Sequence, residues 1–153
     1  MSTIRAVLRD DVDELKKVVD SCGLFPSEFL DEMIFDFFTN DQSQDIWFTF
    51  VENNTPHAIG YCVPEEFTNG TYNLLAIGVS SEYQRSGIAT EMMRYIENLI
   101  KQKEGRLLIV ETSSDEAQMR ARNFYNKMGY KQMAVIEDFW NDGEDKIVFW
   151  KKL

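Results

Sequence analysis

A short polar turn, Gln84-Arg85-Ser86-Gly87-Ile88-Ala89, joins a strand-like run to a long helix-like run. Backbone N–H groups in the first turn of a helix lack partners inside the helix and lie at its positive end, so they can hold phosphate oxygens. Gly87 lets the backbone approach a bulky anion, and Arg85 can add a charged contact from the side. A glycine at such a junction also fits ordinary turn chemistry. The turn therefore predicts a diphosphate site that needs support from its context.

Other binding chemistries have little support in the sequence. Neither G-x-x-x-x-G-K-[ST] nor G-x-G-x-x-G occurs, which disfavours a P-loop and a dinucleotide-binding fold. Cys22 and Cys62 are isolated thiols, and the single histidine, His57, follows Thr55-Pro56 in an apparent hairpin loop, where we expect it on the surface. This spacing offers no metal site. We expect a reduced protein that needs no metal.

The periodicity of apolar residues predicts the elements that must position this turn. Helical spacing occurs in four segments, which run from Asp10 or Asp11 to Gly23, from Ser27 to Thr39, from Gly87 to Lys103 and from Glu116 to Met128. Strand-like runs separate them: Ile4 to Leu8, Ile46 to Glu52, Ala58 to Pro64, Tyr72 to Val79, Leu107 to Thr112, Tyr130 to Asp138 and Lys146 to Lys151. Hairpins around a strand–helix–strand middle predict a mixed sheet covered by helices.

The bulk composition limits the partners. Residues 1–153 fit one domain, and no linker or repeat divides them. The net charge is −10, from 26 acidic and 16 basic residues, so most of the surface would repel a nucleic acid and accept a cationic amine more easily. The acidity also fits a simple role in solubility. Because no apolar signal core opens the chain and no run reaches the ~18 apolar residues of a membrane span, we expect a cytoplasmic protein without a membrane partner.

Two motifs in the right order resemble the GNAT superfamily of coenzyme A-dependent N-acetyltransferases. The family signature [QR]-x-x-G-x-[GA] is matched by Gln84, Gly87 and Ala89, and its late Tyr-x-x-x-Gly-[Phe/Tyr] pattern is matched by Tyr125-Asn126-Lys127-Met128-Gly129-Tyr130. The strand Leu107 to Thr112 lies between the two motifs. The resemblance covers nearly the whole chain. It implies the α/β (α+β) GNAT fold, with about seven strands and about four helices and a splay between strands four and five.

The resemblance also implies acetyl-coenzyme A (acetyl-CoA) as the cosubstrate. The pantetheine arm would lie between the splayed strands and bond to backbone groups of Ile77, Gly78 and Val79. Gln118, where many relatives have Asn, would reach the pantetheine amide. The diphosphate would be bound by the turn residues Gln84, Arg85, Ser86, Gly87, Ile88, Ala89 and Thr90.

The mechanism implied for the family is direct attack of an amine on the thioester. Tyr125 matches the usual general acid and also contacts the cofactor, and the alternative is a packed core aromatic. A backbone N–H near Val79 would stabilise the oxyanion. Asn73 replaces the catalytic Glu of some relatives, so Glu111 is the first substitute base, with Glu65 and Glu66 behind it. A Glu that ends a strand is often only solvated, and an amine that arrives neutral needs no base.

The expected activity is transfer of an acetyl group to a primary amine of an unidentified acceptor, which we expect to be a small molecule, in a ternary complex. Two alternatives stay open. One is a catalytically silent acyl-CoA-binding sensor, and the other is an interaction module that docks through the Phe-rich helix Ser27 to Thr39. That helix and Trp140 are also candidates for the acceptor pocket. A homodimer is a further possibility, because dimers are common in the family.

Overall fold

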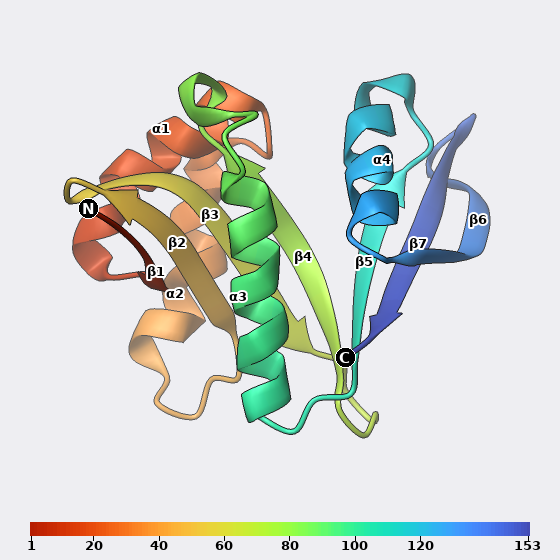
Figure 1. Cartoon of the computed structure of the whole chain (residues 1–153), viewed down its shortest axis with the longest axis horizontal. Helices are drawn as coiled ribbons and strands as arrows, with labels where there is room; N and C mark the ends of the chain where they lie inside the picture. The colour runs from red at the N-terminus through yellow and green to blue at the C-terminus, as the bar shows by residue number, and fades with distance from the viewer.

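The computed structural model describes residues 1–153 as one seven-stranded mixed sheet in the order β1-β2-β3-β4-β5-β7-β6 (Figure 1). The strands are β1 (Ser2–Ala6), β2 (Ile46–Glu52), β3 (Thr55–Pro64), β4 (Thr71–Val79), β5 (Leu107–Ser113), β6 (Lys131–Asn141) and β7 (Glu144–Lys152). The helices are α1 (Val12–Cys22), α2 (Leu30–Thr39), α3 (Ile88–Gln102) and α4 (Met119–Lys127). The predicted mixed sheet with seven strands and four helices is confirmed.

Some predicted boundaries are wrong for local reasons. β1 ends at Ala6 rather than Leu8, because the Leu8 N–H donates to Asp11 Oδ2 at 2.7 Å and begins the turn into α1. β3 begins at Thr55 rather than Ala58, because Asn53 and Asn54 both adopt positive φ and close a two-residue hairpin. The prediction that His57 lies in a loop is therefore wrong.

The late helix also starts later than predicted. A 3₁₀ turn, Glu116–Gln118, precedes α4, and a similar turn, Ser27–Phe29, precedes α2. The predicted stops are confirmed, because Gly23 and Gly129 follow α1 and α4 with φ of 64° and 88°. These glycines let the chain reverse where a residue with a side chain would be strained.

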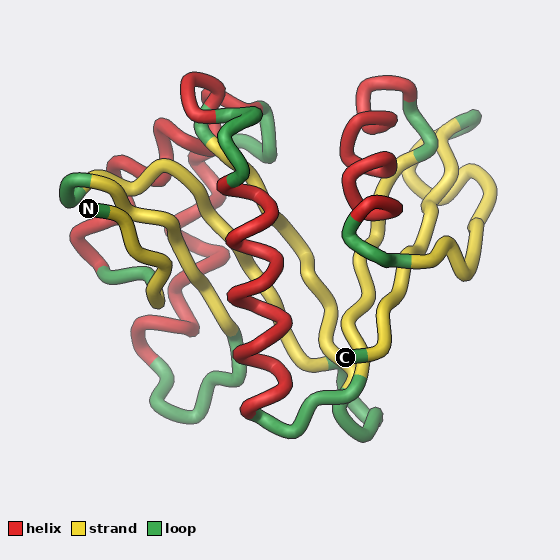
Figure 2. Tube along the Cα trace, viewed as in Figure 1, coloured by secondary structure: helices red, strands yellow, loops and turns green.

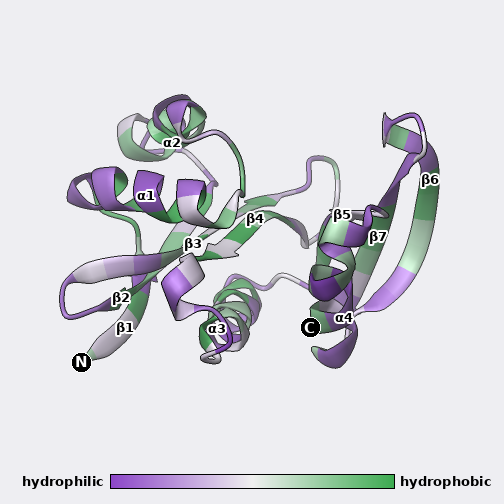
Figure 3. Cartoon of the chain, turned by 90° about the horizontal axis from the view of Figure 1, so that it is seen from above, coloured by the Kyte–Doolittle hydropathy of each residue, from purple (hydrophilic) through white to green (hydrophobic).

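The helices cover both faces of the sheet, as the view from above shows (Figure 3). α3 and α4 lie on one face, over a core that includes Phe48, Met92 and Leu108. α1 and α2 lie on the other face, over a second core that includes Leu15 and Trp47. No helix is long and apolar enough to cross a membrane.

The expected splay between β4 and β5 is confirmed. The two strands pair in parallel only from Thr71 with Leu107 to Leu74 with Val110. The next residue, Leu75, has no partner in β3, because Cys62 pairs with Leu74 and Tyr61 pairs with Ala76. Such a bulge bends a strand and ends its pairing. From Leu75 onward β4 pairs with β3 alone, and a gap opens towards β5 (Figure 1).

Candidate active site

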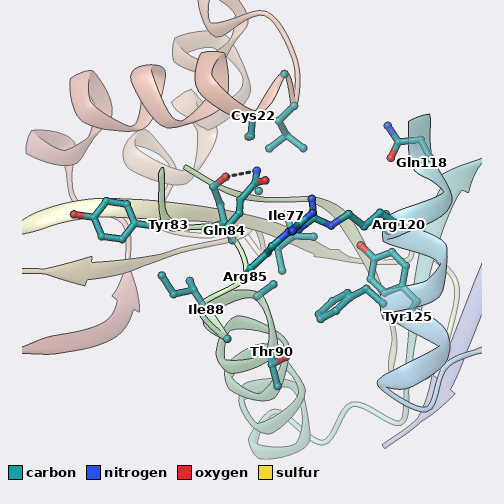
Figure 4. Close-up of a pocket in the computed structure, with 18 of the residues that line it drawn as sticks. Cys22, Ile77, Tyr83, Gln84, Arg85, Ile88, Thr90, Gln118, Arg120 and Tyr125 are labelled. Carbon is teal, nitrogen blue, oxygen red and sulfur yellow. Dashed lines mark hydrogen bonds between the residues drawn. The ribbon is translucent and has the colours of Figure 1, made fainter. Parts of the chain in front are cut away.

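A cavity of about 540 Å³ lies where β4 and β5 separate. Its walls come from β4, from the turn before α3, from α4 and from the residues after α1 (Figure 4). The loops that form it gather at the open end of the sheet (Figure 2). The sequence-predicted residues that line it are Ile77, Gly78, Val79, Gln84, Arg85, Gly87, Ile88, Ala89, Thr90, Gln118 and Tyr125. Ser86 and Glu111 do not line it.

The turn before α3 presents unpaired donors to the cavity. Gly87 precedes the helix with φ of 86°, and Arg85 also has a positive φ, which curls the backbone into an open loop. Backbone N–H groups from Gln84 to Thr90 donate to no other part of the chain. The Gln84 side chain fixes this loop, because its Nε2 donates to the Val79 carbonyl at 3.1 Å (Figure 4). The turn can therefore hold an anion without rearrangement.

Contacts of Ser86, Tyr83 and His57 support the turn. The Ser86 hydroxyl donates to the Tyr83 carbonyl, so this side chain is engaged within the turn. The Tyr83 ring stacks on His57 with 3.8 Å between centroids. His57 thus packs the turn against β3.

The cavity edge of β4 carries free backbone groups. Ser80 N–H donates to the His57 carbonyl at 2.8 Å, so Ser80 faces β3. Because N–H directions alternate along a strand, the Val79 N–H points to the opposite edge, which β5 has left. A polar group in the cavity therefore meets an unpaired backbone donor at Val79.

Gly78 keeps this wall close to the residues that follow α1. A Cβ at this position would lie 2.9 Å from Cys22 Sγ and 3.0 Å from Leu24 Cδ2. The space that glycine leaves is thus taken by this loop, which completes the cavity. Burial raises the pKa of the Cys22 thiol, so the thiol stays protonated near neutral pH.

Tyr125 reaches the cavity from α4 and is only 5% exposed. Its ring packs edge-on or tilted against Phe124, Tyr130 and Phe149, with centroids 5.5 to 5.9 Å apart. Its hydroxyl forms no hydrogen bond within the chain, whereas the Tyr130 hydroxyl donates to Glu97 Oε2 at 2.6 Å. Burial raises the pKa of Tyr125 well above its usual range, so the group remains a proton donor at neutral pH.

Two arginines extend into the space between α3 and α4 from opposite sides (Figure 4). Arg85 belongs to the turn and Arg120 to α4, and both line the cavity. Neither forms a salt bridge, while the neighbouring Arg122 is engaged by the carbonyls of Ser113 and Asp115. In a chain of net charge −10, two unpaired guanidinium groups at one cavity favour an anionic ligand.

Sequence reasoning missed part of the lining. The missed residues on or near α4 share one helical face with Gln118 and Tyr125, so the 3.6-residue period contained a signal for Ala117, Arg120, Ala121 and Phe124. Cys22, Gly23 and Leu24 gave no such signal, because only the tertiary fold brings them to β4, whereas Tyr83 was missed although it directly precedes Gln84.

Glu111 lies in a separate polar group on the other face of the sheet. Leu74 and Val110 pack in the core with α3, so alternation directs Asn73 and Glu111 away from that helix. Asn73 Nδ2 donates to Glu65 Oε1 at 2.8 Å and to Glu111 Oε2 at 3.5 Å. Lys146 Nζ lies 3.0 Å from the same Glu111 oxygen. The structure therefore joins Glu111 and Glu65, two of the candidate bases, through Asn73.

The acetyltransferase (GNAT) family matches residues 12–130, which include the turn, β5 and α4. The chain belongs to the GNAT family. An uncharacterized N-acetyltransferase of Methanocaldococcus jannaschii is 30% identical over 86 residues, which cover 54% of this chain and 53% of that protein. The chain thus spans about half the length of this curated relative.

Solved structures agree with the GNAT assignment. A protein from Desulfovibrio desulfuricans assigned to the GNAT family superposes with a TM-score of 0.93 at 25% identity, over 99% of each chain. An aminoglycoside 6′-N-acetyltransferase complexed with coenzyme A superposes with a TM-score of 0.79 at 16% identity, over 98% of this chain and 96% of that chain. The second likeness shows a shared fold.

Proposed function

We propose that this chain transfers the acetyl group of acetyl-CoA directly to a primary amine of a small-molecule acceptor. The observation that carries this proposal is the cavity at the splay. There a turn with unpaired N–H groups and the free Arg85 faces α4, which carries the free Arg120 and a buried tyrosine hydroxyl without a partner. A phosphate-bearing thioester needs an anion site and a proton donor, and this cavity supplies both. The use of acetyl-CoA by the GNAT family supports the same cofactor.

The cofactor would lie along the gap between the strands. Its diphosphate would accept hydrogen bonds from the turn, whose residues are Gln84, Arg85, Ser86, Gly87, Ile88, Ala89 and Thr90. Its pantetheine arm would follow the unpaired edge of β4 at Ile77, Gly78 and Val79, as a peptide follows the edge of a sheet. Gln118 lines the facing wall and would bond to the pantetheine amide.

The transfer needs no metal. The acceptor nitrogen attacks the thioester carbon and forms the C–N bond, and the carbonyl oxygen becomes an oxyanion near the free Val79 N–H. When the oxyanion collapses, the C–S bond breaks and Tyr125 donates its proton to the departing thiolate. The proton that the amine loses passes to Glu111 through water, because this carboxylate does not line the cavity. Asn73 at the neighbouring position can hold this carboxylate but cannot accept the proton itself.

The test is an amine screen with purified protein and acetyl-CoA. Thiol release measures turnover, and mass spectrometry identifies the acetylated amine. The proposal predicts amine-dependent thiol release and one new N-acetyl product. If acetyl-CoA binds but no amine increases thiol release, the silent sensor replaces the enzyme.

A further inference from the structure

A second polar site lies behind the splay and is distinct from the cofactor cavity. It consists of Glu65 after β3, Asn73 on β4 and Glu111 on β5, which we call the carboxylate cluster. One amide nitrogen, Asn73 Nδ2, donates to a carboxylate oxygen on each side, at 2.8 and 3.5 Å. Three consecutive strands of the sheet therefore hold two carboxylates close together, beside the point where β4 and β5 part.

The cluster has an unmet need for a donor and for positive charge. Asn73 is 3% exposed, and its Oδ1 is buried without a hydrogen-bond partner. A buried carbonyl oxygen without a donor destabilises the folded state. Lys146 is the only cation that contacts either carboxylate, so one of two negative charges has no counter-charge at hand. An added group that donates hydrogen bonds and carries positive charge would satisfy both needs.

Lys146 shows which chemical group this site accommodates. Its ammonium lies 3.0 Å from Glu111 Oε2 and 4.2 Å from the centre of the Phe139 ring. The Lys146 side chain is only 13% exposed. A primary ammonium on an alkyl chain thus already occupies the space between a carboxylate and an aromatic face, a favourable arrangement for such a cation.

The Glu111 side chain is partly exposed, at 25%, on the sheet face opposite α3 and α4. α1 and α2 cover this face over β2, β3 and β4, but no helix covers it over β5 and β7 (Figure 3). Phe139 and Trp140 lie in a break in the β6–β7 ladder and are 46% and 43% exposed. Trp140 Nε1 donates to the Thr112 carbonyl at 3.1 Å, which anchors this aromatic wall beside the end of β5.

We propose that the carboxylate cluster binds one ammonium group of the acceptor, which takes the place of Lys146 at Glu111, while a second amine of the same molecule, after losing its proton to water, attacks the thioester. The inference rests on the proposed acetyl transfer and names the acceptor class for it. Two carboxylates repel an acceptor that carries its own carboxylate next to the amine, and an arylamine is uncharged at neutral pH. The preferred acceptor is an aliphatic amine without an adjacent carboxylate, such as a linear diamine.

The test compares acetylation of 1,5-diaminopentane, glycine and 4-methoxyaniline at equal concentrations with saturating acetyl-CoA. The diamine is expected to have a kcat/KM at least about 10-fold above the other two, since hydrogen bonds to charged groups contribute ~1.5 to 3 kcal/mol. Preference for glycine or for the arylamine would overturn the proposal.

Single-residue variants distinguish binding at the carboxylate cluster from a general effect of the negative surface charge. Glu65→Gln is expected to raise the KM for the diamine about 10-fold and to leave the acetyl-CoA Kd unchanged. Glu104→Gln removes the same charge from an exposed residue just after α3 and should change neither value. Lys146→Met removes the internal ammonium and should lower the KM for the diamine. Equal effects of the two Glu variants, or a raised KM in Lys146→Met, would contradict this site.

Separate binding measurements distinguish failure of the acceptor inference from failure of the proposed acetyl transfer. Calorimetry with acetyl-CoA reports on the cavity, and quenching of Trp140 fluorescence by the diamine reports on the cluster without turnover. Normal acetyl-CoA binding with neither quenching nor diamine acetylation would overturn the acceptor inference alone. Absence of acetyl-CoA binding would overturn the proposed transfer as well.

Discussion

Replacement of Tyr125 by Phe isolates one oxygen atom in the proposed mechanism. The ring is fixed by three aromatic neighbours, whereas the hydroxyl has no hydrogen-bond partner in the chain. Removal of a buried hydroxyl without a partner leaves nothing unsatisfied, so the free energy of unfolding should change by less than about 1 kcal/mol. Loss of a general acid typically lowers turnover by ~10² to 10⁴, which corresponds to about 3 to 5 kcal/mol in the activation free energy.

The assay is steady-state thiol release by Tyr125→Phe with the best acceptor from the screen, together with urea unfolding. We expect kcat to fall at least about 100-fold while the acetyl-CoA Kd stays within about twofold. Tyr130→Phe is the matched control, because its hydroxyl is bonded to Glu97 in a buried network that includes Lys151. This control should lose about 1 to 3 kcal/mol of stability and keep most of its turnover. Unchanged kcat in Tyr125→Phe would refute the role of the hydroxyl.

Three further predictions concern the cavity and the first helix. Arg120→Gln should weaken acetyl-CoA binding about 10-fold and reduce its dependence on salt, which calorimetry at two ionic strengths measures; an unchanged Kd would remove this arginine from the site. Saturating coenzyme A should slow alkylation of Cys22, which lines the cavity, by N-ethylmaleimide. Cys62 should stay unlabelled in the folded protein, because burial raises the pKa of its thiol to about 12. Equal alkylation rates of Cys22 with and without coenzyme A would contradict the placement of the cofactor. Burial alone would raise the pKa of Asp11, but hydrogen bonds from Arg5 and from a backbone N–H outweigh burial and lower the pKa below its unfolded value. This carboxylate therefore stabilises the fold at neutral pH and loses that effect as the pH falls below about 4. In urea unfolding, Asp11→Asn should show a large loss of stability at pH 7 and a small loss at pH 3.

The elements of this fold were readable from the sequence because their signals are local. Helical spacing of apolar residues located α1 and α3, and single glycines marked where α1 and α4 end. The bulge at Leu75 was not predictable in this way, because it depends on how Tyr61 and Cys62 pair with β4. The splay that the bulge accompanies came only from the resemblance to the GNAT family.

In the candidate site, too, features with a local sequence signal were predictable and features that depend on tertiary contacts were not. The turn at Gly87 was predictable, since a glycine between a strand and a helix is a local pattern. The contact between Gly78 and Leu24 joins segments more than fifty residues apart, so no local sequence pattern predicts it. Glu65 and Glu111 were both named as candidate bases, but their link through Asn73 follows from the register of three strands.

The most direct test of the central claim is a calorimetric titration with acetyl-CoA of the wild-type protein and of two glycine variants. Gly87 and Gly143 have φ of 86° and 81°, and a Cβ would meet no atom within 4 Å at either position. Gly87→Glu and Gly143→Glu thus add the same charge and similar backbone strain, one in the cavity and one in the β6–β7 turn. Saturable one-site binding by the wild-type protein and by Gly143→Glu, but not by Gly87→Glu, is the predicted result. Normal affinity in folded Gly87→Glu, or no binding by the wild-type protein, would contradict the placement of acetyl-CoA at this turn.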